Sequence, residues 1–62
     1  MNTKYDLHDL MFGQGKQTNF GTMLIKLILK ADNSNKEKLR LGFPEAVSVV
    51  EEYIATGKDP LA

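Results

Sequence analysis

One apolar stretch, residues 20–31, constrains the fold of this 62-residue chain more than any other part of its sequence. It is apolar over more than two turns of helix, and its Leu, Met, Lys and Ala residues favour helix over strand. At about 100° per residue, the apolar side chains gather on one broad face and the polar ones on a narrow stripe. The stretch therefore predicts an amphipathic helix over residues 19–31. The broad face consists of Phe20, Met23, Leu24, Leu27, Ile28 and Ala31, and the stripe of Thr22, Lys26 and Lys30.

Ile25 and Leu29 fall outside both the broad apolar face and the polar stripe. They extend the apolar surface of the predicted helix beyond what a half-exposed helix needs. The helix must then be wrapped by the rest of the chain or shared with another molecule. We take Ile25 and Leu29 as the candidate apolar interaction residues, with homodimerisation as the commonest way to bury such a surface.

The N-terminal part of the chain predicts a short helix followed by a loop. Asp6 suits a helix N-cap, and the apolar residues after it are spaced for a helix over residues 6–12. Residues 13–19 contain two glycines and no large apolar side chain, which is typical of a loop. Thr18 or Asn19 at the end of this loop can cap the central helix.

Helix-capping and helix-breaking residues predict two further helices after the central one. Ser34 and Glu37 have the spacing of a capping box, which favours a helix over residues 35–41 that ends at a left-handed Gly42. Pro44 cannot continue a helix but suits the first position of a new one. The sequence thus predicts a single all-α domain over residues 1–62, a small bundle with main helices at 19–31 and 44–56, short helices at 6–12 and 35–41, and disordered tails at 1–4 and 58–62.

Composition limits the compartment and the kinds of partner. The chain has no cysteine, which fits a reducing setting and excludes disulfides and thiolate metal sites. No apolar run reaches the roughly 18 residues of a membrane span, and the start is polar, unlike a signal peptide. Eight basic and eight acidic residues cancel, which argues against strong general attraction to nucleic acid or anionic membranes. We expect a soluble cytoplasmic protein without membrane association.

The residue types that carry enzyme chemistry are not arranged as a site. Residues 13–18 contain glycines and Lys16, but not at the spacing of a phosphate-binding loop. His8 is the only histidine, and we expect it to face solvent. Glu51 and Glu52 are helix neighbours whose side chains point apart. We therefore expect no enzyme, no catalytic residue, no cofactor, no metal site and no small-molecule substrate.

The middle of the chain is basic, whereas residues 41–62 are mainly acidic. Lysines on the central helix and cations on the next helix suggest one positive face, and a helix, turn and helix also occur in DNA-binding proteins. Against this, the second helix is short and lacks the side chains that most often read bases. The candidate nucleic-acid residues are Lys16, Lys26, Lys30, Lys36, Lys38 and Arg40.

Residues 30–45 carry a recognisable pattern that covers about a quarter of the chain. The pattern resembles short uncharacterised open reading frames of bacteria and phages. This resemblance implies a small accessory protein of a phage or prophage and transfers no defined activity. From the residues alone, the same pattern is two helix caps and a helix break. It reads Lys30-Ala31-Asp32, an Asn-bearing turn, Lys38-Leu39, and Gly42-Phe43-Pro44-Glu45.

Two functions follow from these features. The first is a non-enzymatic interaction protein that binds a second copy or another protein through surplus apolar surface on the central helix. The second is a small nucleic-acid-binding regulator that uses the basic middle of the chain. A homodimer or a protein partner is the favoured prediction, and nucleic acid is the alternative partner.

Overall fold

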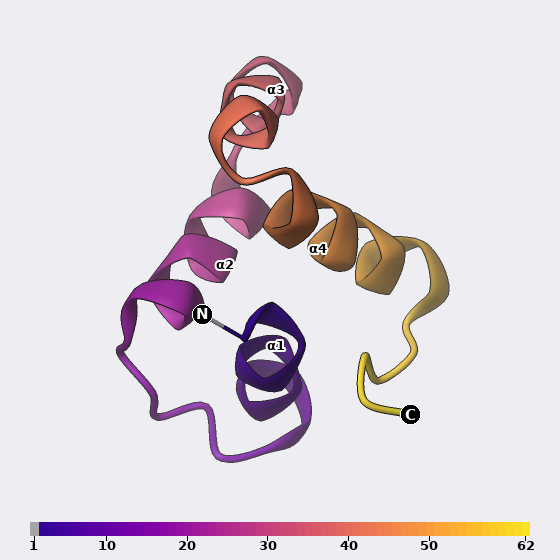
Figure 1. Ribbon diagram of the computed structural model, residues 1–62. Helices are drawn as coiled ribbons and strands as arrows, with labels where there is room; N and C mark the ends of the chain where they lie inside the picture. The colour runs from indigo at the N-terminus through magenta and orange to yellow at the C-terminus, as the bar shows by residue number, and fades with distance from the viewer. Residues whose placement is uncertain (1) are drawn as a thin grey trace.

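The computed structural model describes residues 2–62 and, over that range, folds into four α-helices without a strand (Figure 1). The predicted all-α bundle is confirmed. The two longest helices match the two predicted main helices to within a residue or two at each end. The helices are α1 (Thr3–Phe12), α2 (Phe20–Lys30), α3 (Asn33–Gly42) and α4 (Pro44–Thr56).

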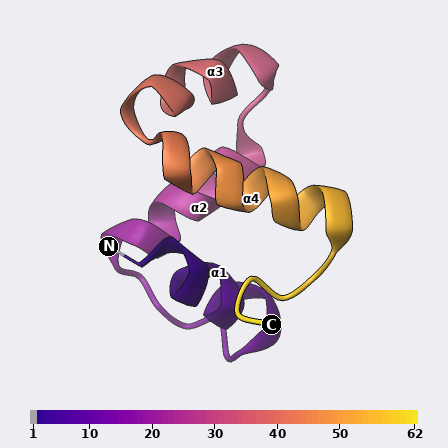
Figure 2. The ribbon, with the colours of Figure 1, turned by 45° about the vertical axis from the view of Figure 1, so that its right-hand side comes forward.

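The four helices are arranged around the contact between α2 and α4. α1 packs on both of these helices, whereas α3 packs mainly on α4. Figures 1 and 2 show α1 and α3 at opposite ends of the molecule, with α2 and α4 between them. The loop over residues 13–19 runs along the α1 end, and the short connection between α2 and α3 lies at the other end.

The hydrophobic core comes from three of the four helices. Burying one apolar side chain of this size contributes about 1.5–3 kcal/mol relative to leaving it in water. No side chain of α3 is fully buried, although Leu39 packs against the edge of the core. α3 therefore depends on other contacts for its attachment. The core residues are Leu7 of α1, Leu24, Ile25 and Ile28 of α2, and Ala46, Val47 and Val50 of α4.

Asn and Asp side chains begin the first three helices. The backbone N–H of Thr22 donates to Oδ1 of Asn19 at 2.8 Å, so Asn19 rather than Thr18 caps α2. Asp32 caps α3 in the same way, with the N–H of Asn35 donating to its Oδ1 at 2.8 Å. Each cap satisfies a backbone donor that has no partner within the helix.

Two helices start earlier than predicted because the caps are different residues. α1 starts at Thr3 instead of residue 6, since Asn2 accepts a hydrogen bond from the backbone N–H of Tyr5. α3 starts at Asn33 instead of residue 35, since Asp32 and not Ser34 is its N-cap. Both predictions were wrong in the same way, because an Asn or Asp residue that precedes the predicted cap takes its place.

The two predicted tails have defined contacts in the structure. Residues 1–4 were predicted to be disordered, but Thr3 is buried in the first turn of α1, so the prediction is wrong for Thr3. Met1 lies outside the described residues. Residues 58–62 were also predicted to be disordered. They instead fold back along α1, where the carboxylate of Asp59 contacts the imidazole of His8.

A glycine ends α4, whereas the end of α3 differs from the prediction. Gly57 follows α4 with φ +69°, a left-handed conformation that L-amino acids with a side chain rarely adopt. Gly42 was predicted to be left-handed, but it is the last residue of α3, and Phe43 forms the junction with φ −136°. The break between α3 and α4 is therefore made by Phe43 and Pro44 and not by a glycine.

Candidate functional site

The structure overturns the proposed role of Ile25 as an interaction residue. Ile25 is 0% exposed and lies in the core, whereas Leu29 is 37% exposed at the edge of the buried face. The core face of α2 is turned toward Gly21 and Thr22, both of which are buried. Thr22 was predicted to lie on the polar stripe, and its burial is what brings Ile25 inside.

Because the buried face is turned this way, α2 exposes its other apolar edge to solvent. Phe20, Met23 and Leu27 are 65%, 49% and 52% exposed, respectively. Their spacing of three and then four residues places them in one row along the helix, which we call the apolar stripe. The ring of Phe20 also lies 5.8 Å, centroid to centroid, from the ring of Phe43. The surplus apolar surface predicted for this helix is thus present, but it is made by different residues.

The sequence contained a signal for the true orientation of α2. Gly21 and Thr22 are two small residues that lie next to each other at the start of the stretch, and small residues allow another helix to approach closely. Polarity alone placed Thr22 on the solvent side. In the structure its hydroxyl is nevertheless buried, without a hydrogen-bond partner among residues 2–62.

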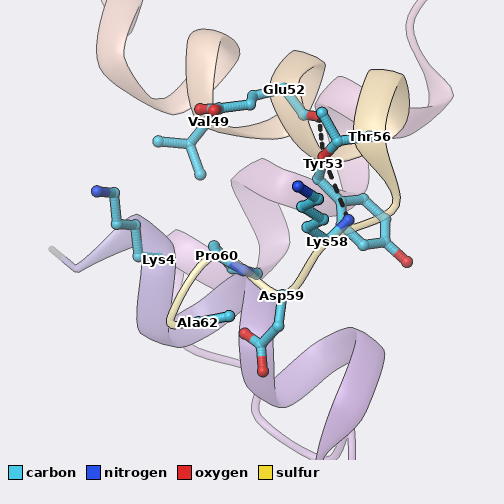
Figure 3. A pocket seen from close by; sticks show the side chains of 9 residues that line it. All are labelled: Lys4, Val49, Glu52, Tyr53, Thr56, Lys58, Asp59, Pro60 and Ala62. Atoms are coloured by element: carbon cyan, nitrogen blue, oxygen red, sulfur yellow. Dashed lines mark hydrogen bonds between the residues drawn. The ribbon is translucent and has the colours of Figure 1, made fainter.

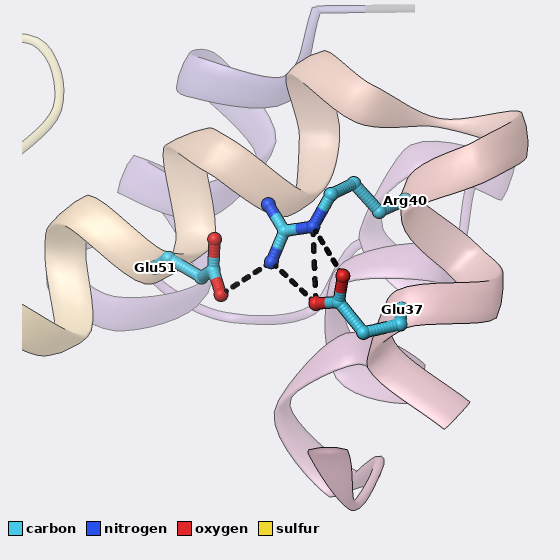
Figure 4. Close-up of polar contacts among 3 residues, drawn as sticks. All are labelled: Glu37, Arg40 and Glu51. Atoms are coloured by element: carbon cyan, nitrogen blue, oxygen red, sulfur yellow. Dashed lines mark hydrogen bonds and ion pairs between the residues drawn. The ribbon is translucent and has the colours of Figure 1, made fainter. Parts of the chain in front are cut away.

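Arg40 is held in an ion-pair network and does not belong to a free basic face. Its guanidinium donates to Glu37 on the same helix at 3.0 Å and to Glu51 of α4 at 2.7 Å (Figure 4). These hydrogen bonds raise the pKa of Arg40 above its usual range, Glu51 having the larger effect, and Arg40 in turn lowers the pKa of the Glu51 carboxyl. The network attaches α3 to α4, which the sequence reasoning missed because Arg40 and Glu51 are eleven residues apart.

The structure separates the predicted basic residues into several places. The 13–19 loop, which contains Lys16, lies at the end of the molecule opposite α3 (Figures 1 and 2). Lys36 lies close enough to Glu51 to lower the pKa of that carboxyl further, after the larger effect of Arg40. Lys30 and Lys38 are brought together, since both line one groove between α2 and α3.

This groove, which we call the α2–α3 groove, lies where α2 ends and the chain turns into α3. The turn is made by Ala31 in an extended conformation and by Asp32. The groove has a volume of about 510 Å³. Its apolar lining is Leu27, Ala31 and Leu39, and its polar lining is Lys30, Lys38, Asp32 and Asn35.

A second, smaller pocket of about 340 Å³ lies between α4 and the C-terminal segment (Figure 3). Its lining is mixed, with Val49, Glu52 and Tyr53 of α4 facing Lys58 and Pro60. The Asp59 carboxylate also borders this pocket but is directed toward α1. The pocket is thus formed by the return of the segment after α4.

His8 and Asp59 hold that returning segment on α1. Nδ1 of His8 lies 2.7 and 2.9 Å from the two carboxylate oxygens of Asp59. His8 is therefore paired with Asp59, whereas the sequence analysis predicted a histidine that faces solvent. The backbone N–H of Leu61 donates to the same carboxylate at 2.9 Å. That N–H and then His8 lower the pKa of Asp59. The imidazole also stacks on Phe12, with ring centroids 6.0 Å apart. His8 and Asp59 therefore each have a second contact within the fold, His8 with Phe12 and Asp59 with the backbone of Leu61.

Within residues 2–62, no group of three or more His, Cys, Asp or Glu side chains is placed to hold a metal ion. No helix in the same range is long and apolar enough to cross a membrane. Comparison of the chain with family models, curated proteins and solved structures finds no match. The resemblance of residues 30–45 to phage and bacterial reading frames therefore stays a prediction.

Proposed function

We propose that the protein is a non-enzymatic, self-associating interaction protein of the cytoplasm, and that two copies meet through the apolar stripe of α2. The observation that supports this proposal is the exposure of Phe20, Met23 and Leu27 in one row on a single helix. Scattered apolar residues are normal on protein surfaces, but a contiguous apolar row is typical of an interaction site.

The second copy is the favoured occupant because the stripe complements itself. In an antiparallel pair of α2 helices centred near Met23 and Leu27, Lys30 of one copy lies level with Phe20 of the other. The lysines are then kept at opposite ends of the interface, and apolar side chains face each other in the middle. Such a two-fold arrangement uses the same residues on both copies.

The small size of the core gives self-association a physical purpose. Among residues 2–62, seven apolar residues are buried, and the chain has no cysteine for a disulfide. Domains of this length bury a smaller fraction of their surface than larger ones, and oligomerisation is one of the usual ways to add stability. An interface on α2 would extend the core through the same helix that already contributes Leu24, Ile25 and Ile28.

Sedimentation velocity over a range of micromolar concentrations tests the proposal. The wild type should shift from monomer toward dimer as concentration rises, and Leu27→Glu should remain monomeric. Ile54→Glu is the matched control, because Ile54 is 54% exposed on α4 and outside the stripe. A strictly monomeric wild type, or equal loss of dimer in both variants, contradicts the proposed interface.

The nucleic-acid alternative receives less support from the arrangement of charges. Arg40 and Lys36 are close to carboxylates of their own chain. The 13–19 loop, which contains Lys16, lies at the opposite end of the molecule from α3 (Figure 1). Retention on DNA that falls steeply with salt would favour this alternative.

A further inference from the structure

We propose that the α2–α3 groove binds an acidic, partly apolar segment of a different protein. The inference rests on the juxtaposition of an apolar floor, made by Leu27, Ala31 and Leu39, with two lysine side chains at its edges. It goes beyond the proposed self-association, with which it shares Leu27 and, at the end of that interface, Lys30.

The groove results from the way α2 ends. The chain leaves the helical conformation at Ala31 and re-enters it at Asn33, so α2 and α3 diverge from a tight corner. α3 packs mainly on α4, which leaves the side of α3 that faces the end of α2 uncovered. Leu27 and Leu39 border this space from the two helices. Its volume lies within the usual range of small binding sites and suits a few apolar side chains.

The charges around the groove favour carboxylates. Lys30 and Lys38 are exposed, and neither forms an ion pair with any residue in the described range 2–62. The one carboxylate in the lining, Asp32, already accepts the N–H of Asn35 as the cap of α3. The edges of the groove therefore offer two ammonium groups to an incoming ligand. Complementary charges at the edge of an apolar contact guide binding and select the partner.

An acidic peptide fits these features better than a nucleic acid does. A nucleic-acid strand needs several cations that follow its phosphates, or aromatic side chains on which its bases stack. The groove has two lysines and an aliphatic floor. An amphipathic helix or loop with Leu-like side chains on one face and Glu or Asp beside them matches both parts of the lining.

The test uses fluorescence anisotropy with labelled synthetic peptides. The probe is an amphipathic helical peptide with Leu at every third or fourth position and Glu on the flanks. One control peptide carries Lys in place of Glu, and a second carries Ser in place of Leu. A labelled DNA duplex provides the nucleic-acid arm. The wild-type protein should bind the Leu–Glu peptide more tightly than either control peptide or the DNA.

Charge reversal at the groove should weaken this binding specifically. The double variant Lys30→Glu with Lys38→Glu should lower the affinity for the Leu–Glu peptide about tenfold or more. Lys16→Glu, in the distant loop, is the matched control and should bind like the wild type. Circular dichroism of each variant verifies that the helices are intact.

Equal binding of all the peptides, tighter binding of DNA, or unchanged affinity in the double variant would overturn the proposal. Sedimentation velocity of the double variant separates the two interactions. If it still dimerises but loses the peptide, the groove is an independent site, as proposed. If it becomes monomeric while it loses the peptide, the groove belongs to the self-interface and this inference is wrong. If the wild type is monomeric yet binds the peptide, the groove proposal stands and the self-association fails.

Discussion

Replacing Ile25 with alanine should destabilise the protein much more than replacing Leu27, although both are aliphatic residues on α2. Ile25 has no exposed surface, whereas about half of Leu27 is in water. The pair thus measures which edge of α2 faces the core.

The expected magnitudes follow from burial. Truncating a fully buried Ile to Ala costs about 2–5 kcal/mol, through lost transfer energy and the cavity left behind. Full burial of a Leu side chain contributes about 1.5–3 kcal/mol, so the half-buried Leu27 should lose about 1 kcal/mol on truncation. A chain of this length has a total stability of about 3–9 kcal/mol. Ile25→Ala therefore removes much of the stability, and Leu27→Ala a minor part.

Urea unfolding followed by circular dichroism is the assay. It should be run at a low protein concentration, because self-association adds stability that depends on concentration. Ile25→Val is a milder variant, expected to cost about 0.5–1.5 kcal/mol, which keeps the comparison measurable if Ile25→Ala does not fold.

A cost for Leu27→Ala at low concentration that equals or exceeds the cost for Ile25→Ala would refute the assigned orientation of α2. A cost below about 0.5 kcal/mol for Ile25→Val combined with a fully folded Ile25→Ala would refute it as well.

Three further predictions address the ends and the interior of the fold. Gly57→Ala should lower the free energy of unfolding by about 1 kcal/mol, because residue 57 has a left-handed backbone. Gly42→Ala, in open space at the end of α3, should raise it by up to about 1 kcal/mol. Thermal unfolding of both variants checks that the two changes have opposite signs. Thr22→Val should raise the free energy of unfolding by about 1 kcal/mol, because it replaces a buried hydroxyl that has no partner among residues 2–62. Urea unfolding measures this change, and a lower free energy of unfolding in Thr22→Val would contradict the prediction. Asp59 has a lowered pKa in the fold, so its charge stabilises the protein above about pH 4 and this contribution disappears as the pH falls through the folded-state pKa. Urea midpoints measured from neutral to acid pH should therefore fall less in Asp59→Asn than in the wild type.

The helices were largely predictable because their signals are local. Pro44 and the apolar period of the last helix placed α4 correctly, and the apolar run placed α2. The starts of α1 and α3 were missed by two or three residues, since several Asx and Ser residues compete for each cap. Such competition is decided by where the chain enters the helix, which depends on tertiary packing.

The candidate site was less predictable because it depends on contacts between distant residues. The existence of surplus apolar surface on α2 followed from composition, but the choice between its two edges depended on the burial of Thr22. The contacts of Arg40 with Glu51 and of His8 with Asp59 join residues that are 11 and 51 positions apart. Pattern reasoning along one helix has no access to such pairs.

The most direct test of the central claim is the rate of thiol alkylation in single-cysteine variants, since the chain has no cysteine of its own. Leu27→Cys places a thiol in the apolar stripe, and Ile54→Cys places one on exposed α4. We predict that alkylation of Leu27→Cys slows as protein concentration rises into the dimer range, whereas the rate for Ile54→Cys stays constant. A Leu27→Cys rate that does not change with concentration would contradict self-association through α2.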